Sequence, residues 1–215
     1  MRLILIRHGE TAHNRDQVTL GRADVPLNER GLAQAEAVAA SFRRPPAAIY
    51  ASPLQRAFAT AMAIGAATGV EVIAEAALIE MDVGEMEHLT GRQLRESYPD
   101  FLRAWLTGGA ADARMPGGET LREVQERAWD AIERIGAAHP QGEVVAVSHN
   151  FVILTLVCRA LGLPLADFRR LKQALAAKTV IDLRDGVATL LQLNDNAHII
   201  AAGLGDDLAG KEAQR

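Results

Sequence analysis

The architecture of this chain is predicted from residues 3–11, which read Leu-Ile-Leu-Ile-Arg-His-Gly-Glu-Thr. The first four residues are apolar and do not alternate with polar ones, which is typical of a buried strand in a parallel or mixed sheet. Ligands of open α/β sheets bind at the carboxyl ends of such strands. We therefore expect Arg7 and His8 to line a binding crevice, and Gly9 to allow a sharp turn or a close backbone approach to a ligand.

The residue types that follow this strand suit phosphoryl chemistry. A neutral imidazole is a competent nucleophile near pH 7, and the planar donor fork of a guanidinium matches the oxygens of a phosphate. Considered without the rest of the chain, residues 7–10 fit equally well a hydrogen-bonded structural histidine beside a solvated arginine. Other segments have to distinguish the two interpretations.

Two further apolar runs end in polar residues of the same kinds. Residues 47–51 are predicted to form a short strand, after which Ser52 caps a helix that carries Arg56 in its first turn. Residues 144–147 form another predicted strand and lead into His149. Because the carboxyl ends of parallel strands meet at one edge of a sheet, we expect this arginine and this histidine to face the first crevice.

A carboxylate is predicted to join them. Residues 70–73 are predicted as a strand, and Glu80 and Asp82 follow it among apolar neighbours. Partial burial raises the pKa of a carboxyl group, which a general acid near neutral pH requires. The alternative is that both are solvated loop carboxylates, which is the commoner situation for acidic residues.

These segments resemble the signatures of the histidine phosphatase superfamily, which includes the cofactor-dependent phosphoglycerate mutases. Residues 7–11 match its Arg-His-Gly-Glu-Thr motif unaltered, and residues 52–57 match Ser-Pro-Leu-x-Arg-Ala. Residues 78–84 resemble its Leu-x-Glu-x-Asp-x-Gly acid segment, and residues 117–120 match Gly-Gly-Glu-[Ser/Thr]. The resemblance extends from residue 3 to about residue 198.

One position departs from the family pattern. The family has Ser-His-Gly where this chain has Asn150 after its histidine. Asparagine tolerates left-handed backbone angles better than most residues, so we expect the turn to survive and the shape of the pocket to change.

The resemblance implies a three-layer α/β/α sandwich with a mostly parallel mixed sheet and a helical cap. We expect a single domain over residues 1–202 with the cap inserted at about 86–116, and a loose tail over 203–215. The cap carries Phe101, Arg103 and Trp105. An aromatic residue at helical spacing is more often packed inward than used to line a pocket.

The resemblance also implies two-step hydrolysis of a phosphomonoester. His8 attacks phosphorus, and a hydrogen bond from its other ring nitrogen to a backbone carbonyl sets its tautomer. Arg7, Arg56 and a protonated His149 bind the nonbridging oxygens. Glu80 protonates the leaving oxygen and then activates water. The predicted substrate-binding set further contains Asn14, Gly21, Arg22 and Asn150. Glu10 is expected to hold an arginine.

Composition disfavours several other classes of protein. The 215 residues include 4% aromatics and no Lys/Arg block, and the net charge is −4, which argues against nucleic-acid or membrane binding. Cys158 is the single cysteine, and no Cys/His spacing suggests zinc. We expect a cytoplasmic enzyme that acts on a small phosphorylated substrate without metal or cofactor. Its oligomeric state is left open, a dimer included.

Two other functions remain open. A cofactor-dependent phosphoglycerate mutase would return the phosphoryl group to its substrate, and a non-catalytic module would only bind a phosphorylated ligand. Mutases of the family carry a basic segment and a longer insert beyond the acid, whereas residues 85–90 are acidic and short here. All five catalytic positions are filled, which disfavours the binding module. Sugar phosphates, phosphoglycerates and α-ribazole phosphate all stay open as substrates.

Overall fold

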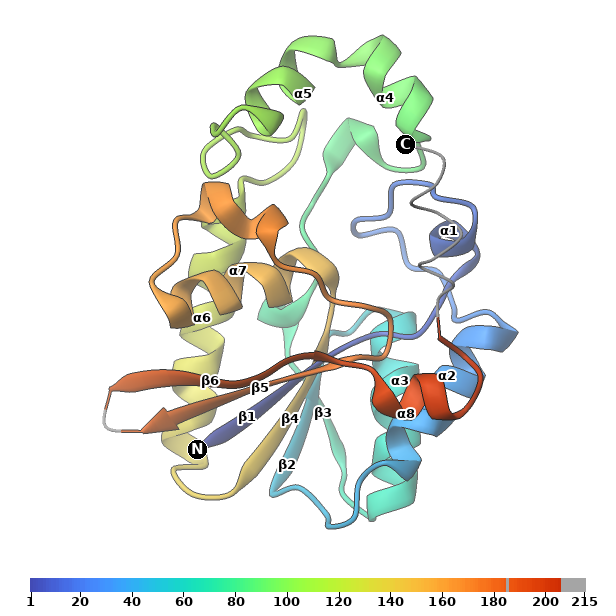
Figure 1. Cartoon of the computed structure of the whole chain (residues 1–215), viewed down its shortest axis with the longest axis vertical. Coiled ribbons are helices and arrows are strands. Elements are labelled where there is room, and N and C mark those ends of the chain that lie inside the picture. The colour runs from blue at the N-terminus through green and yellow to red at the C-terminus, as the bar shows by residue number, and fades with distance from the viewer. Residues whose placement is uncertain (185, 206–215) are drawn as a thin grey trace.

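A six-stranded mixed sheet forms the centre of the molecule (Figure 1). The computed structural model describes residues 1–184 and 186–205. The strand order is β3-β2-β4-β1-β5-β6. The strands are β1 (Arg2–Arg7), β2 (Ala48–Ala51), β3 (Val72–Ala74), β4 (Glu143–Ser148), β5 (Lys178–Arg184) and β6 (Val187–Asp195). The pairs β1/β4, β2/β4 and β2/β3 are parallel, and β5 pairs antiparallel with both β1 and β6, which confirms the predicted mixed sheet.

The register between the two central strands determines where the site forms. Ile6 of β1 lies opposite Val147 of β4, and Arg7 lies opposite Ser148. The four central residues of each strand are apolar and buried, because each strand is covered on its two faces. Consequently His8 and the histidine that follows β4 leave the sheet at the same level.

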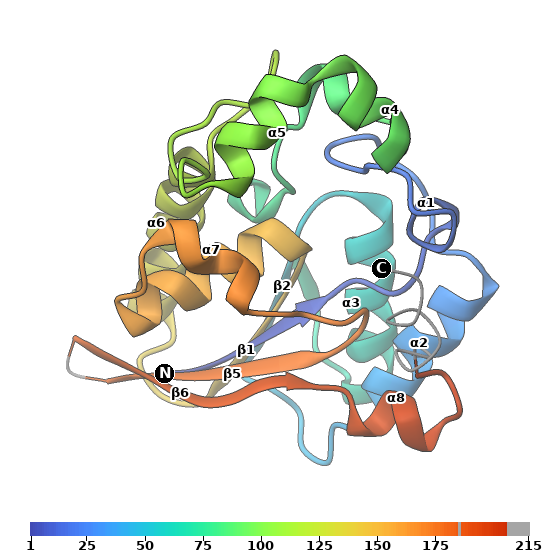
Figure 2. The ribbon, with the colours of Figure 1, turned by 45° about the horizontal axis from the view of Figure 1, so that its top comes forward.

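Helices cover both faces of the sheet and form the outer layers (Figure 2). One face packs against α2 (Glu29–Ala40), α3 (Gln55–Thr68) and α8 (Ala197–Ala201), and the other packs against α6 (Leu121–Ala138) and α7 (Asn150–Leu161). Alternate residues of β1 serve the two cores: Ile4 and Ile6 belong to the first and Leu3 and Leu5 to the second. The predicted three-layer sandwich is confirmed.

Polar side chains cap several of the helix starts. The Asn28 side chain accepts a hydrogen bond from the Gly31 amide at 2.8 Å and caps α2. Thr90 and Thr120 form capping boxes at α4 (Gly91–Ser97) and α6. Polar and turn-forming residues over 12–27 predict a surface loop, within which four residues form the short helix α1 (Ala12–Arg15).

Parts of two predictions lie outside the described residues. The Asp-Gly pair at 185–186 predicts a hairpin turn, and Asp185 lies outside the described residues. The loose tail was expected over 203–215, of which only 203–205 are described. Among the helices of the described chain, none is long and apolar enough to cross a membrane.

The cap is built on an inward-facing aromatic cluster. Helices α4 and α5 (Pro99–Leu106) lie together at one end of the molecule in both ribbon views. The Trp105 ring stacks on Phe101 at 5.5 Å between centroids and meets Phe151 and Phe168 edge-on at 6.2 and 5.7 Å. Trp105 is buried, so its ring anchors α5 to the sheet domain, as inward packing predicts. Short 3₁₀ helices complete the fold: η1 (Ala76–Leu78), η2 (Gly84–Met86) and η3 (Leu165–Arg170).

Candidate active site

The five predicted catalytic side chains converge beyond the carboxyl ends of β1, β2 and β4. The rings of His8 and His149 lie 5.1 Å apart between centroids. The positive charges of Arg7 and Arg56 both act on the pKa of these two imidazoles and of the Glu80 carboxyl. The structure therefore brings together residues from four separate segments of the chain.

His8 is buried and held in one tautomer. Its Nδ1 lies 2.7 Å from the carbonyl oxygen of Gly9. Because a carbonyl oxygen only accepts, Nδ1 carries the proton and Nε2 keeps its lone pair. Burial, and then the charges of Arg56 and Arg7, hold the pKa of His8 well below its usual value. The ring is thus a neutral imidazole with Nε2 free to attack an electrophile.

Gly9 is required for packing against α2. A Cβ at this position would lie 2.4 Å from the carbonyl oxygen of Gly31. The predicted close approach is therefore made to another backbone segment of the protein. Glu10 then accepts from the Asn28 side chain at 2.8 Å and forms an ion pair with Arg30 at 3.7 Å, which confirms that it holds an arginine.

Arg56 is fully buried and oriented by a loop from the beginning of the chain. Its two terminal nitrogens donate to the carbonyl oxygens of Gly21 at 2.7 Å and Ala23 at 2.8 Å. Its Nε is buried and has no hydrogen-bond partner among the described residues. On the other side of the loop, Glu87 accepts from the amides of Gly21 and Ala23 at 2.7 and 3.1 Å.

The same contacts give Gly21 a structural role, whereas the sequence predicted that it contacts substrate. Both backbone polar groups of Gly21 are engaged, one with Glu87 and one with Arg56. A Cβ on Gly21 would approach the carbonyl oxygen of Met81 and the side chain of Val83 to 2.7 Å each. Gly21 therefore orients Arg56 and packs under the acid segment.

His149 is held by a serine from the end of β2. Its Nε2 lies 2.7 Å from the Ser52 hydroxyl, and its buried Nδ1 has no hydrogen-bond partner in the described part of the chain. Ser52 was predicted to cap α3, and this is wrong: Leu54 occupies the N-cap position without a side-chain hydrogen bond. The serine hydroxyl instead orients the imidazole.

The charge state of His149 depends on whether an anion is bound. Burial, and then the charges of His8, Arg56, Arg7 and Arg127, hold its pKa well below the usual value. His149 is therefore neutral while no anion offsets the arginines. A protonated His149 requires the negative charge of a bound phosphate.

Glu80 has the environment that a general acid needs. Its side chain is buried, and burial is the main cause that raises its pKa above the usual value. Hydrogen bonds from the amides of Met81 at 2.8 Å and Phe151 at 3.3 Å oppose that shift, as do Arg56 and Arg7. The alternative of a solvated loop carboxylate is wrong for this residue.

Arg22 was predicted to contact substrate, and the structure places it elsewhere. Its Nε donates to the carbonyl oxygen of Glu80 at 3.3 Å, and its terminal nitrogens meet Asp82 at 3.5 Å and Glu119 at 2.9 Å. All three nitrogens are thus engaged with the segment that carries the acid. This arrangement supports a structural role for Arg22, which holds the segment that carries Glu80.

The two asparagines have different settings. The Asn14 side-chain oxygen accepts from the amide and hydroxyl of Thr11 at 3.1 and 3.0 Å, which leaves the amide nitrogen as the donor for a ligand. Asn150 is the first residue of α7 and is absent from the residues with positive φ. The expectation of a left-handed turn at Asn150 is therefore wrong, because the helix begins immediately after His149.

Three supporting residues were missed from the sequence. Gln173 accepts a hydrogen bond from Arg7 at 2.8 Å through its backbone oxygen, and Thr60 accepts from the amide of Gly9 at 3.1 Å. Arg127 contacts the backbone of Glu80. None of them lies within one of the matched motifs, so their place in the folded chain identifies them.

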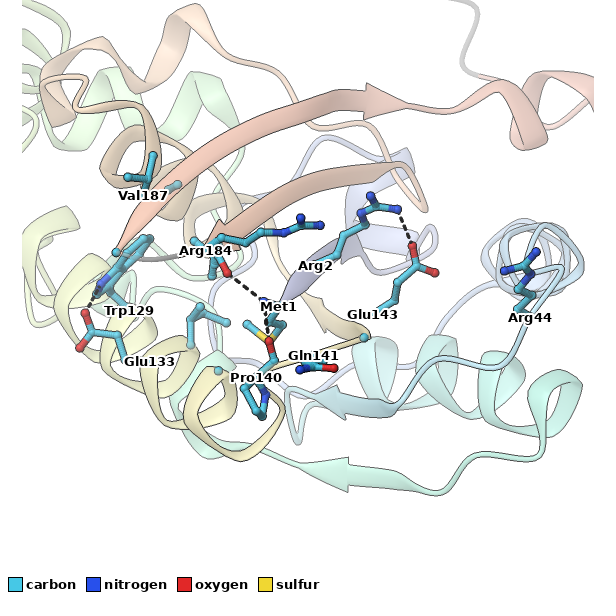
Figure 3. A pocket seen from close by; sticks show the side chains of 16 residues that line it. Met1, Arg2, Arg44, Trp129, Glu133, Pro140, Gln141, Glu143, Arg184 and Val187 are labelled. Atoms are coloured by element: carbon cyan, nitrogen blue, oxygen red, sulfur yellow. Dashed lines mark hydrogen bonds and ion pairs between the residues drawn. The ribbon is translucent and has the colours of Figure 1, made fainter.

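A separate cavity lies at the opposite edge of the sheet (Figure 3). It has a volume of about 980 Å³ and is lined at the amino ends of β1 and β4 by residues that include Met1, Arg2, Trp129, Glu143 and Val187. It contains none of the predicted site residues. Because strands present ligands at their carboxyl ends, this hollow is not the candidate active site. Across residues 1–184 and 186–205 there is no cluster of three or more His, Cys, Asp or Glu side chains suited to a metal ion.

The sheet order and the strand-end residues define an α/β protein of the phosphoglycerate mutase-like type. The family model of the histidine phosphatase superfamily (branch 1) matches residues 3–196. The chain belongs to this superfamily.

Relatives within the superfamily carry different names. Phosphoserine phosphatase 1 of Hydrogenobacter thermophilus is 32% identical over 200 residues, which cover 93% of this chain and 94% of that protein. A probable phosphoglycerate mutase of Cronobacter sakazakii is 35% identical over 173 residues, which cover 80% of each. The solved structure of a mycobacterial glucosyl-3-phosphoglycerate phosphatase matches with a TM-score of 0.84 and 30% identity, covering 91% of this chain and 99% of that one.

Proposed function

We propose that this protein is a metal-independent phosphomonoester hydrolase that acts on a small phosphorylated metabolite through a phosphohistidine on His8. The observation that carries the proposal is the buried, neutral His8, whose Nδ1 is bound to the Gly9 carbonyl and whose Nε2 is available. Two guanidiniums and a second imidazole surround it. This combination supports attack on a phosphate ester.

The first step transfers the phosphoryl group to the enzyme. Nε2 of His8 attacks phosphorus, the bond from phosphorus to the ester oxygen breaks, and protonated Glu80 gives its proton to that oxygen. Arg7, Arg56 and His149 bind the nonbridging oxygens. The phosphate charge offsets the arginines, which favours the protonated form of His149 during this step.

The second step releases phosphate. Glu80, now a carboxylate, takes a proton from water while the water oxygen attacks phosphorus. The bond between phosphorus and Nε2 breaks, inorganic phosphate leaves, and His8 and Glu80 return to their starting states. Asn14 is the proposed further donor to a phosphate oxygen, and Asn150 is a proposed contact to the substrate.

Hydrolysis is preferred over mutase activity for two reasons. Residues 85–90 are acidic and short, and the relatives named as phosphatases match almost the full length of the chain. We further propose that residues 1–202 act as one domain with a cap at about 86–116, and that the enzyme works in the cytoplasm, which fits its single, buried Cys158.

One assay separates the candidate functions. The protein is incubated, with a chelator present, with p-nitrophenyl phosphate and separately with 3-phosphoglycerate plus 2,3-bisphosphoglycerate. Release of phosphate under chelation is the expected result. Rapid isomerisation of phosphoglycerate with little release would establish a mutase instead. Binding of inorganic phosphate without either activity would indicate the binding module.

A further inference from the structure

Glu80 lies in a segment without regular secondary structure. The 3₁₀ helix η1 ends at Leu78 and η2 begins at Gly84, so residues 79–83 have no helix or strand to hold them. The position of the acid therefore depends on side chains that grip its backbone. A displacement of about 1 Å at a catalytic group can slow a reaction about 100-fold, so this support matters for rate.

Two guanidiniums provide that grip. The carbonyl oxygen of Glu80 accepts from Arg127 at 3.1 Å and from Arg22 at 3.3 Å. Arg127 lies on α6 and also donates to the carbonyl oxygen of Ala77 at 2.7 Å, so it spans the start of the acid segment. Both arginines approach the backbone of Glu80, whereas its carboxyl group is bound by the amides of Met81 and Phe151.

Glu119 joins the two arginines to each other and to the acid segment. Its Oε1 accepts from Arg22 at 2.9 Å and from Arg127 at 3.0 Å. Its Oε2 accepts from Arg127 at 3.1 Å and from the amide of Asp82 at 2.9 Å. The backbone amide of Glu119 also donates to the carbonyl oxygen of Asp82 at 2.9 Å. Glu119 therefore binds both the backbone amide and the backbone carbonyl of Asp82.

We propose that Glu119 and Arg127 are positioning residues for the proposed general acid, and that they set the location of the Glu80 carboxyl through its backbone. The inference rests on the proposed function. Arg127 binds the carbonyl oxygen of Glu80, whereas the carboxyl group is bound by backbone amides, so Arg127 acts on where the acid lies. Glu119 holds Arg127 in a two-pronged carboxylate pair, which fixes the plane of the guanidinium.

The test uses two substrates of nearly the same shape. Phenyl phosphate needs a proton on its leaving oxygen, whereas p-nitrophenyl phosphate has a far better leaving group. The ratio of their kcat/KM values isolates the acid, because kcat/KM covers the steps up to loss of the leaving group. We expect Arg127→Met and Glu119→Gln to lower kcat/KM for phenyl phosphate by about 10-fold or more and that for the nitrophenyl ester by less than about threefold.

Arg134→Met is the matched control. Arg134 lies on the same helix and pairs with Glu75 at 3.6 Å, but it does not contact Glu80. It should leave the ratio of the two substrates unchanged. Arg127→Lys should behave as Arg127→Met does, because one ammonium group cannot replace the fork that binds Glu119 and two carbonyls together.

A double variant tests whether the residues act through Glu80. Once Glu80→Gln has removed the acid, adding Arg127→Met should change the substrate ratio no further. An equal loss with both substrates in the single variants, or an additive loss in the double variant, would overturn the inference. Should Arg127→Met fail to fold, the nearly isosteric Glu119→Gln carries the same measurement. If Glu80→Gln slows both substrates equally, the proposed role of Glu80 as the acid is wrong, and the result then concerns the proposed function and not only the positioning residues.

Discussion

The imidazole rings of His8 and His149 lie 5.1 Å apart at the ends of the neighbouring parallel strands β1 and β4. Both rings are buried, and each has a pKa held well below its usual value by burial and by the charges of Arg56 and Arg7. Before an anion binds, the pocket therefore contains two neutral imidazoles and two positive guanidiniums. A bound phosphate dianion would add negative charge beside both guanidiniums and both imidazoles.

The first prediction concerns stability against pH. A histidine whose folded pKa is lowered stays neutral in the native state, while the unfolded chain takes up a proton below about pH 6.5. The contribution of such a histidine to the free energy of unfolding is complete above that pH and is lost as the pH falls toward the folded pKa. As the pH falls through that window, each of His8 and His149 should lower the free energy of unfolding by up to about 1.4 kcal/mol per pH unit. Urea denaturation between pH 5 and pH 8 measures the slope.

Variants separate this effect from that of Glu80. The folded pKa of Glu80 is raised, so its contribution has the opposite sign and is lost as the pH rises through that pKa. His8→Asn and His149→Gln should each flatten the acid-side loss of stability. A wild-type slope in both site variants would contradict the neutral-imidazole assignment.

The second prediction is that His8→Ala abolishes turnover and leaves the fold intact. The imidazole is the proposed nucleophile, and its removal takes away the group that bonds to phosphorus. Phosphate release and thermal unfolding should be measured on the same preparation. Reactions are quenched with acid and brought at once to alkaline pH. The wild-type protein should then retain a phosphohistidine, and the variant should not. A residual rate near that of the wild type would rule out the phosphohistidine mechanism.

The third prediction assigns the leaving-group proton to Glu80. Glu80→Gln keeps the shape of the side chain and an acceptor for the Met81 amide, but it has no acidic proton. It should slow phenyl phosphate by about 100-fold and the nitrophenyl ester much less. For phenyl phosphate, wild-type kcat/KM should fall as the pH rises through the raised pKa of Glu80, and this limb should vanish in the variant. Equal slowing of both esters counts against the acid role.

The fourth prediction tests the serine behind His149. The Ser52 hydroxyl lies 2.7 Å from Nε2 of His149 in a buried setting. Ser52→Ala leaves that nitrogen without its partner, which should lower the free energy of unfolding by about 1–3 kcal/mol. Because phosphate binding is common to all substrates, both aryl phosphates should slow by the same factor, unlike in the Glu80 variant. Ser97→Ala, at the exposed end of α4, is the control and should change neither quantity.

Four of the proposed catalytic residues were predictable because each lies just after a buried strand that the local sequence identifies. An unbroken apolar run identifies a buried strand, and the first charged residues after it must leave the sheet at its edge. Arg7, His8 and His149 satisfy this rule directly. Arg56 satisfies it through the first turn of a helix. The predicted strands over 3–6, 47–51 and 144–147 all lie within or overlap strands of the structure.

The supporting residues were not predictable in this way. Arg22 pairs with Glu119, 97 positions later in the chain, and Arg127 reaches Glu80 across 47 positions. Spacing along the chain carries no information on such pairs. Ser52 and Gly21 show the same limit, since local rules favoured a helix cap and a ligand contact while distant segments engage both residues instead.

Residues 3–11 by themselves determined that a buried strand ends in an arginine and a histidine, because side-chain polarity and strand burial are local properties. Only the tertiary structure decided that Nε2 of His8 is the free nitrogen, that His149 is neutral before an anion binds, and that Glu119 and Arg127 stand behind the acid. Charge states and hydrogen-bond partners depend on burial and on distances between segments, and these exist only once the sheet has brought the strand ends together.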